Sequence, residues 1–476
     1  MNVISGEQDM SMISRVKAAL FLWYPFKEDS KVLLVDENDD NLKDILDKSI
    51  YKLDTASVED IPKTGAYDHI IFTCLPERYK KPYEIIQSCR ACLKESGTFI
   101  FSMNNRIGIR YFCGDRDPYT NGVFDGVENY NHVNLNEKSI SGRMYTADEM
   151  KGFIKKAGFR KCQFYSVYSG LEYPLHIISE GYIPNEDLAN RIIPMYHYPY
   201  TVFLEEETLY QTLSENGLLH KMANAYLVEC GTENAVFSNS QYISCSLERS
   251  EENAMITIIN NDDTVAKRAL FDEGKKRLSV LKENHESLNS RGISAVTIDV
   301  NGAEAIMPYM EYPTVQKHLQ KLLMEDKREF LRVLDRFMDE IDKSAIISGT
   351  DDIYGPLAQK AYIDMVPLNC LYANGEFIFI DQEYVLENYP INIVKARVML
   401  TFFSKHDELR FVEDELYERY GLLEKKLLYR EKEHEFLREL WSEEQLGTYR
   451  RSMQRDQEIT GQNRMRMNYP AVHNKA

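Results

Sequence analysis

YDHIIFTCLP at residues 67–76 and LKESGTFIFSMNN at residues 93–105 carry the clearest structural pattern in this sequence. Each contains an apolar run, HIIF at 69–72 and TFIFSM at 98–103, typical of a strand that is buried on both faces. Between them, YEIIQSCRACLKESG has the spacing of a helix that Gly97 would end. A strand, a helix and another strand predict an α/β domain with a parallel sheet covered by helices.

The same pattern begins earlier, at VLLVDENDDNL (32–42), where an apolar run precedes an acidic turn and a helix. Nucleotide-binding domains keep a glycine-rich loop at this place, because backbone N–H groups must approach a phosphate or carboxylate closely. The turn here has no glycine. It has four acidic side chains, which would fill that space and repel a carboxylate: Asp36, Glu37, Asp39 and Asp40.

Composition limits the partners that we expect. The chain has 476 residues, 43% hydrophobic and 28% charged, which suits two or three domains with their own cores. A formal net charge of −18 argues against binding to nucleic acid or to an anionic membrane, since both require a basic face. The sequence has no signal peptide and nothing close to the ~18 apolar residues of a membrane span, so we expect a cytoplasmic protein without a transmembrane segment.

The eight cysteines are scattered along the chain. Cys89 and Cys92 form a CxxC pair, but no second pair follows at the spacing of a zinc site. We therefore expect two buried thiols on one face of a helix.

The pattern changes beyond residue 235, where three β-like runs follow one another: QYISCSLER (241–249), AMITIINN (254–261) and TVAKRAL (264–270). The turn NNDD joins the last two, which predicts an antiparallel meander. A helix over 272–288, a strand over 298–312 and a helical stripe over 315–341 come next. This order predicts the small lobe of a kinase-type α+β fold, followed by a larger helical lobe.

Behind these helices stands YIDMVPLNCLYANGEFIFIDQEY (362–384). Asp364 and Asn369 have the spacing of the D-x-x-x-x-N in a kinase catalytic loop, and Asp381 follows a short hairpin. One carboxylate must reach the acceptor hydroxyl, while an amide oxygen and a second carboxylate must meet the magnesium ions that bridge the ATP phosphates. The spacing predicts a site for ATP and Mg²⁺.

Four blocks of the chain resemble one bacterial family, in which a class I methyltransferase-like domain is fused to a kinase-like domain. They are FLWYPFKEDSKVLLV, SGTFIFSMNNRIGIRYFCGDRDPYTNGVFDGVENY, MYTADEMKGFIKKAGF and YTVFLEEETLYQTLSENGLLHKMANAYLVE. Members of this family are found beside glycosyltransferases for cell-surface polysaccharides. The resemblance implies a transferase of surface-glycan biosynthesis with a glycan or lipid-linked sugar as acceptor. It also implies glycosyltransferase partners, which would hold a cytoplasmic protein at the membrane periphery.

The stretch 362–384 resembles the aminoglycoside and choline kinase branch, whose magnesium motif is D-x-E. By that resemblance Asp364 would orient or deprotonate the acceptor hydroxyl, and magnesium would be held by Asn369, Asp381 and Glu383. Nucleotide contacts would come from the strand residue Lys267, its helix partner Glu283, and the hinge residues Met310, Glu311 and Tyr312. Two features depart from this branch: Tyr362 replaces a histidine, and SLERSEENA (246–254) replaces a glycine-rich loop.

The cofactor turn is where the first half departs from a working S-adenosylmethionine site. Asp54 is the acid placed to hold the cofactor's ribose, but Tyr67 begins the next strand too soon for the helix and strand that normally intervene. We infer a trimmed, Rossmann-like sheet that has lost S-adenosylmethionine binding. A receiver domain with magnesium at Asp36 and Glu37 would require an aspartate after the central strand, where Thr73 and Cys74 stand instead.

The segment after residue 104 is the candidate substrate region of the first half, because it combines polar and aromatic residues as carbohydrate sites do. Its candidates are Asn105, Arg106, Tyr111, Asp125, Glu128 and Asn129. The alternative is that Arg106 and Asp125 form an internal ion pair that fixes the loop.

We predict three segments: a methyltransferase-like domain over 1–232, a kinase-like domain over 233–404, and a charged helical tail over 405–476. Leu409, Val412, Leu416 and Tyr420 form an apolar stripe in the tail, which either docks a partner or packs on the kinase-like lobe. The leading functional hypothesis is transfer of the ATP γ-phosphoryl group to a sugar or glycan hydroxyl. The alternatives are an inactive scaffold for glycosyltransferases and an active S-adenosylmethionine-dependent methyltransferase.

Overall fold

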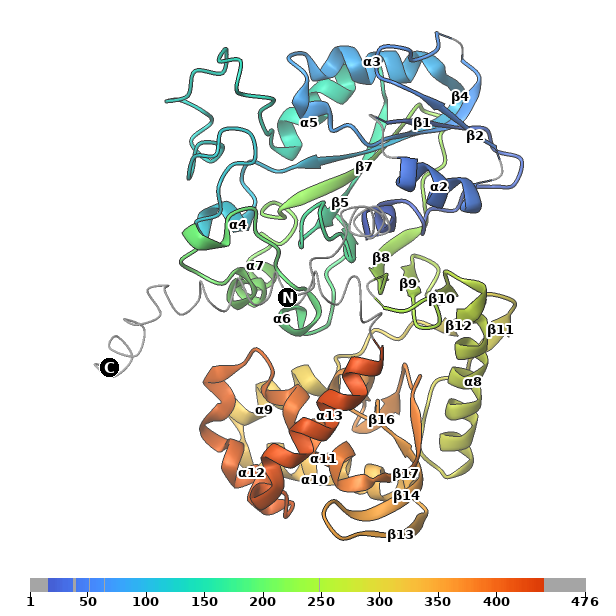
Figure 1. Cartoon of the computed structure of the whole chain (residues 1–476), viewed down its shortest axis with the longest axis vertical. Helices are drawn as coiled ribbons and strands as arrows, with labels where there is room; N and C mark the ends of the chain where they lie inside the picture. The colour runs from blue at the N-terminus through green and yellow to red at the C-terminus, as the bar shows by residue number, and fades with distance from the viewer. Residues whose placement is uncertain (1–15, 37–39, 51, 64, 248, 441–476) are drawn as a thin grey trace, which may run out of the picture. The chain divides into compact units, whose positions relative to one another are not determined.

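The computed structural model describes residues 16–440 except 37–39, 51, 64 and 248. The chain divides into two compact units (Figure 1). The first holds the described residues up to Ile183 together with Ile192–Leu247, and the second holds Pro184–Arg191 and the described residues from Arg249 onward. A short excursion from the first half of the chain therefore belongs to the second unit.

A mixed sheet with the order β2-β1-β3-β4-β7-β5-β6-β8 forms the centre of the first unit. The first four strands are parallel, and β7 lies antiparallel between β4 and β5. β6 and β8 continue the sheet as antiparallel neighbours. The bounds are β1 (Val32–Val35), β2 (Leu53–Ala56), β3 (Tyr67–Phe72), β4 (Leu93–Asn104), β5 (Lys161–Val167), β6 (His176–Ser179), β7 (Ala225–Gly231) and β8 (Ser240–Cys245).

Helices cover both faces of this sheet (Figure 1). α3 (Pro82–Cys92) connects β3 to β4 and packs beside α5 (Ala147–Lys156), whereas α2 (Asp40–Ser49) connects β1 to β2 on the other face. All four residues of β1 are buried, as expected of a parallel strand between two helical layers. The short helices α4 (Ile109–Phe112) and α7 (Tyr210–Glu215) complete the unit.

The strand, helix and strand predicted at 67–105 are confirmed, and so is the trimmed sheet. β2 leads to β3 directly, since the described residues between Ala56 and Tyr67 form no helix or strand. One boundary differs: Leu93–Gly97 begins β4 rather than ending α3, because Leu93 already pairs with Tyr67. Cys89 and Cys92 are buried in α3, as predicted.

The second unit begins with an antiparallel sheet of order β11-β12-β10-β9 and one long helix, α8. A chain segment at 309–314 then leads to two helices, a three-stranded sheet, a hairpin and three further helices. The first part comprises β9 (Met255–Asn260), β10 (Thr264–Ala269), α8 (Lys275–Ser290), β11 (Asp299–Asn301) and β12 (Glu304–Pro308). The second comprises α9 (Val315–Glu325), α10 (Lys327–Ser344), β13 (Ile347–Asp351), β14 (Gly355–Tyr362), β15 (Cys370–Ala373), β16 (Glu376–Phe379), β17 (Val385–Pro390), α11 (Ile391–Phe403), α12 (Glu413–Arg419) and α13 (Lys426–Leu440).

Two separate hydrophobic clusters fill this unit, which gives it two lobes. The smaller cluster lies between the β9–β12 sheet and α8 and includes Met255, Leu278 and Met307. The larger cluster lies among α9, α10, α11 and the three-stranded sheet. Leu409 and Leu416 are buried in the larger cluster, so the apolar stripe of the predicted tail packs on its own lobe.

The structure places the domain boundaries differently from the prediction at 232 and 404. β8, expected to open the second domain, pairs with β6, so the first unit extends to Leu247. Residues 405–440 belong to the core of the second unit, and the end of the predicted tail lies outside the described residues. No helix in the described part of the chain combines the length and the apolar character needed to cross a membrane.

Candidate functional sites

The first candidate site is the edge of the first unit where its parallel strands end, because sheets of this kind bind ligands at the carboxyl ends of their strands. The hydroxyl of Thr73, just after β3, donates a hydrogen bond to the Asp36 carboxylate and lies 3.3 Å from the Val35 carbonyl. The Cys74 thiol donates to the same carbonyl over 3.6 Å. Side chains therefore join the ends of β1 and β3 at the edge where a cofactor would lie, and the loss of S-adenosylmethionine binding stays a prediction.

The acidic turn is described only in part. Asp36 bonds to Thr73, and Asp40 begins α2, whereas Glu37 and Asp39 lie outside the described residues. Within the described part of the chain, no three carboxylate, histidine or cysteine side chains form a cluster suited to a metal ion. Because Glu37 lies outside the described residues, the structure does not test the magnesium site of the rejected receiver domain.

Asp54 lies on β2 away from the cofactor edge. Its carboxylate is 2.9 Å from the Lys31 ammonium and accepts a hydrogen bond of 2.9 Å from the Tyr67 hydroxyl. Lys31 precedes β1 and Tyr67 begins β3, so these contacts lie at the amino ends of the strands. The predicted ribose contact requires the opposite edge, and the position of Asp54 does not suit it.

Glu77 is a buried acid at the carboxyl edge that the sequence analysis missed. It follows Leu75, whose φ of 59° turns the chain, and its side chain is 1% exposed. One carboxylate oxygen accepts hydrogen bonds from the Asn104 backbone N–H (2.8 Å) and side-chain amide (3.2 Å). The other has no hydrogen-bond partner among the described residues, and burial raises the pKa of Glu77 to about 7. An acid in the loop five residues after the end of a buried strand was the signal that could have marked it.

The predicted substrate residues have structural partners instead. The Asn105 amide donates to the backbone carbonyls of Lys221 and Ala223 at 3.0 and 2.8 Å, and so ties two chain segments together. Arg106 pairs with Glu149 at 3.0 Å rather than with Asp125. The predicted alternative, an Arg106–Asp125 pair, is therefore wrong.

The remaining members of this set do not converge on one site. The Asp125 carboxylate accepts a 2.7 Å hydrogen bond from Thr120, and Glu128 is exposed beside His132. Asn129 accepts a 2.8 Å hydrogen bond from Arg143. Their role in binding a substrate remains a prediction.

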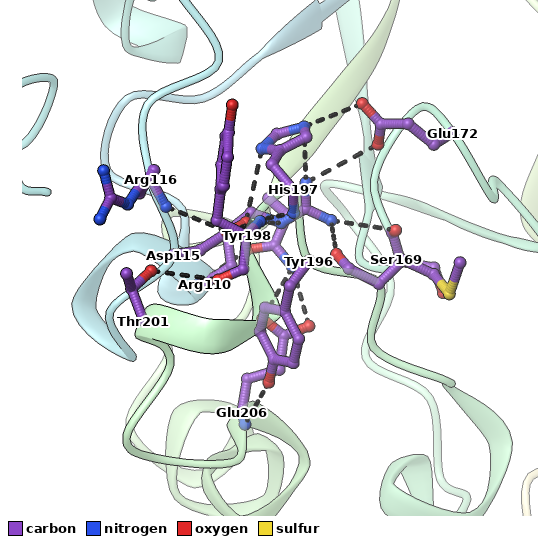
Figure 2. A network of polar contacts seen from close by, with 12 residues as sticks. Arg110, Asp115, Arg116, Ser169, Glu172, Tyr196, His197, Tyr198, Thr201 and Glu206 are labelled. Carbon is purple, nitrogen blue, oxygen red and sulfur yellow. Dashed lines mark hydrogen bonds and ion pairs between the residues drawn. The ribbon is translucent and has the colours of Figure 1, made fainter. Parts of the chain in front are cut away.

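Tyr111 adjoins a buried polar network centred on Arg110 of α4. Figure 2 shows this network. The guanidinium of Arg110 is fully buried and donates to the backbone carbonyls of Ser169, at 3.1 Å, and Met195. It also faces Glu172 at 3.7 Å. The ring of Tyr111 stacks near the imidazole of His197, with 6.4 Å between ring centroids.

Opposite charges balance inside this network. Burial opposes the charged forms, but Glu172 and Asp115 raise the pKa of His197 to about 9. His197 and Arg110 likewise outweigh burial and hold the pKa of Glu172 well below its ordinary value. Asp115 accepts hydrogen bonds from the backbone N–H groups of His197 (2.9 Å) and Tyr198 (2.7 Å). The network therefore fixes the segment around His197 on α4.

The second unit brings together the residues predicted for phosphoryl transfer. Lys267 of β10 is almost fully buried, and its ammonium contacts both the Asp381 and the Glu383 carboxylates. These charges outweigh burial and raise the pKa of Lys267. Asp381 has a left-handed backbone, with φ of 59°, a conformation that often occurs at functional sites.

Asp364 and Asn369 complete this cluster. Asp364 is 7% exposed, accepts a 3.0 Å hydrogen bond from the Tyr384 backbone N–H, and lies 3.8 Å from the Arg397 guanidinium. Burial raises its pKa to about 7, although Arg397 opposes this. The Asn369 amide donates to the Asp364 backbone carbonyl at 3.4 Å, which places the predicted magnesium ligand beside the predicted base.

The helix partner predicted for Lys267 is wrong. Glu283 is exposed on α8, and the two residues that follow it face the site. The Asn284 amide donates to the Gln382 carbonyl at 2.8 Å, and His285 accepts a 3.2 Å hydrogen bond from the Gln382 N–H. Because Leu281 and Leu288 are buried, the helical period points residues 284 and 285 inward.

The predicted hinge residues lie where the two hydrophobic clusters of the second unit are joined. Met310 packs on the smaller cluster, and the Tyr312 N–H donates to its backbone carbonyl at 2.8 Å. Glu311 between them is exposed. An adenine contact at these residues remains a prediction.

The strand order gives the class of fold of the first unit. Parallel strands continue on both sides of β1, and an antiparallel β7 is inserted between β4 and β5, as in a Rossmann-like methyltransferase domain. No family model and no curated protein matches the sequence.

Several solved structures resemble part of the chain. A SAM-dependent methyltransferase from Thermotoga maritima is 11% identical over 47% of this chain and 91% of its own, with a TM-score of 0.27. One from Archaeoglobus fulgidus is 13% identical over 46% and 93%, with a TM-score of 0.26. A Haemonchus contortus phosphoethanolamine N-methyltransferase in complex with S-adenosylmethionine is 10% identical over 45% and 52%, with a TM-score of 0.25. At these scores the matches carry no inference about activity, and the methyltransferase-like description of the first unit concerns its fold.

Proposed function

We propose that the second unit binds a nucleoside triphosphate with Mg²⁺ and transfers its γ-phosphoryl group to a hydroxyl acceptor. The observation that carries this proposal is the convergence of Lys267, Asp364, Asp381 and Glu383, which come from a strand, a loop and the end of a hairpin. An acid near the acceptor, a lysine for the phosphates and a carboxylate pair for the metal are the parts that phosphoryl transfer requires.

The carboxylate pair fits a magnesium ion. The Lys267 ammonium already lies between Asp381 and Glu383, so these two side chains favour a cation at that point. Magnesium commonly takes one or two protein carboxylates and completes its shell with phosphate oxygens and waters, so a third acidic ligand is not required. When bound, the ion would neutralise charge on the phosphates, and Lys267 would be available to contact them.

Asp364 would accept the proton of the acceptor hydroxyl. The hydroxyl oxygen forms the new bond to the γ-phosphorus, the bond from that phosphorus to the bridging oxygen breaks, and the nucleoside diphosphate leaves. A base with a pKa of about 7 suits this role near neutral pH. From the family resemblance in the sequence, we propose a sugar or lipid-linked glycan as the acceptor, in surface-polysaccharide biosynthesis with glycosyltransferases as partners.

One observation favours methyl transfer as a second candidate function. Glu77 is a buried acid with a pKa near 7 at the edge where a methyltransferase-type domain binds its substrates, so it could serve as a general base. The contacts of Thr73 with Asp36 at the same edge oppose this candidate.

Thermal-shift titrations of the full chain separate these functions. A ligand at 100 times its Kd stabilises a native protein by about 2.7 kcal/mol. We expect a shift with ATP and Mg²⁺ that is lost in Asp381→Asn and kept in Asp299→Asn, an exposed acid of the same unit. Slow transfer of the ATP γ-phosphoryl group to water should be lost in Asp364→Asn. A shift with S-adenosylmethionine alone would favour methyl transfer, and a shift with neither ligand would favour an inactive scaffold.

A further inference from the structure

The proposed nucleotide site has an arginine where a glycine-rich loop would lie. Residues 246–254 precede β9 and contain no glycine. Glycine-rich loops hold phosphates with backbone N–H groups, and this segment offers a side chain instead. Arg249 places its Nη1 3.6 Å from a Glu383 carboxylate oxygen, and its side chain is 32% exposed.

A second arginine reaches the same site from the first half of the chain. The short helix α6 (Leu188–Arg191) lies in the excursion that belongs to the second unit. Arg191 donates from Nη2 to the backbone carbonyl of Leu368 at 3.3 Å, and its Nε lies 2.8 Å from Glu186. Leu368 stands between the predicted base Asp364 and the predicted magnesium ligand Asn369, so Arg191 borders the place of the transferred phosphoryl group.

Anchoring contacts hold this excursion on the larger lobe. The Asp187 carboxylate is 2.8 Å from His406 Nε2 and accepts a 3.0 Å hydrogen bond from the Gln320 amide. Burial opposes both charged forms, but His406 lowers the pKa of Asp187 and Asp187 raises the pKa of His406. Both shifts favour the charged pair. Arg191 is therefore held by its neighbours rather than by a ligand.

Cationic side chains lie beside the proposed metal pair, Asp381 and Glu383. The Lys267 ammonium contacts both carboxylates, and Arg249 lies 3.6 Å from Glu383. Arg191 donates to the Leu368 carbonyl in the loop between Asp364 and Asn369. Two cations therefore contact the carboxylate pair, and a third lies beside the neighbouring loop. Asp381 and Glu383 would hold a magnesium ion, and the three cations would then be available to a polyanionic triphosphate.

We propose that Arg249 and Arg191 form a phosphate clamp, in which Arg249 replaces the glycine-rich loop and Arg191 contacts the γ-phosphoryl group. The clamp rests on the proposed phosphotransfer function. Guanidinium groups suit it because their planar fork binds phosphate oxygens in pairs, and an arginine supplied in cis can stabilise the charge of the transferred group. The site therefore prefers a triphosphate over a diphosphate through Arg191.

Calorimetric titration of the full chain with MgATP and MgADP tests the clamp. Arg249→Gln should weaken both ligands at least tenfold, which is about 1.4 kcal/mol. Arg191→Gln should weaken MgATP at least tenfold and leave MgADP within twofold. Arg268→Gln is the matched control, since Arg268 follows Lys267 on β10 but pairs with Glu304 at 2.9 Å, and it should bind both ligands as the wild type does.

Two results would overturn the clamp alone, and a third would overturn the proposed function together with it. If the wild type and both arginine variants bind the nucleotides equally well, the clamp is refuted but the proposed function is not. The same holds if Arg191→Gln loses affinity for MgATP and MgADP equally. A wild type that does not bind MgATP removes the proposed function as well.

A second measurement does not depend on how the variants fold. Phenylglyoxal modification of the wild type, mapped by mass spectrometry, should be slowed at Arg249 by either nucleotide and at Arg191 by MgATP only. Modification of both arginines at the same rate with and without MgATP would refute the proposal.

Discussion

Replacing Lys267 by methionine should destabilise the second unit by about 3 kcal/mol. Removing one partner of a buried ion pair costs about 3–5 kcal/mol, because it leaves an uncompensated buried charge. Lys267 and Glu383 have side chains that are each 5% exposed, so Glu383 would lose its nearest cation in a nearly dry place and keep Arg249 at 3.6 Å. Asp381 has a side chain that is 40% exposed and can be solvated by water, which puts the expected cost at the lower end.

Differential scanning calorimetry of the full chain measures this effect. For a unit of this size, about 3 kcal/mol corresponds to a fall in Tm of about 6–12 °C. The control is Arg268→Met at the next position of β10, where the pair with Glu304 has side chains that are each 35% exposed. Exposed pairs contribute about 0–1 kcal/mol, so this variant should change the Tm of the second unit by no more than about 4 °C.

Two further results follow from the same reasoning. Adding Glu383→Gln to Lys267→Met should recover part of the lost stability, because the stranded carboxylate is then removed. Magnesium chloride should raise the Tm of Lys267→Met more than that of the wild type, because it replaces the missing cation. Equal losses in Lys267→Met and Arg268→Met, or a double variant that is less stable than Lys267→Met, would refute the central position of this ion cluster.

Three predictions concern the first unit. Its stability should fall as pH rises from 7 to 10, because the pKa of His197 is raised from 6.5 to about 9 in the folded protein. Urea unfolding measures this, and the free energy of unfolding of His197→Gln should change less with pH. Glu77→Gln should raise the Tm at pH 8 and leave it unchanged at pH 4.5. The pKa of Glu77 is raised to about 7, so the wild type loses stability as Glu77 ionises, and a lower Tm of the variant at pH 8 would contradict this. Gly170→Ala should cost more than about 2 kcal/mol, because its φ is 84° and a Cβ would lie 2.3 Å from Arg110 Nη2; Gly158→Ala, with φ of 94° and open space, should cost less in the same unfolding assay.

The strands that the sequence predicted well are those whose environment is uniform. β1, β3 and β4 lie between helical layers, so their buried residues form continuous apolar runs that can be recognised without knowing the neighbouring strands. β8 was predicted in the second domain because an antiparallel strand has the same alternation whichever sheet it joins. Its partner β6 lies far away in sequence, and nothing in the residues of β8 specifies that pairing.

In the candidate site of the second unit, the sequence likewise predicted best the residues that lie close together along the chain. Asp364, Asn369 and Asp381 lie in one stretch in which a fixed loop and hairpin set their spacing, so the sequence could show that they meet. The predicted contact of Glu283 with Lys267 was wrong because only one side of a helix faces a given neighbour. The buried leucines of α8 show that Asn284 and His285 lie on that side.

Arg191 could not be predicted from such local rules, because its contact with Leu368 joins residues 177 positions apart. That contact depends on an excursion from the first half of the chain, anchored through Asp187 to His406. A motif can show where the acids of a phosphoryl-transfer site lie, but a cation supplied from a distant segment becomes visible only when the chain is folded. If Arg191 acts as proposed, the phosphate specificity of the second unit depends on residues from the half of the chain that carries the methyltransferase-like fold. Removing that half would then remove γ-phosphate recognition while leaving Lys267, Asp364 and Asp381 in the chain.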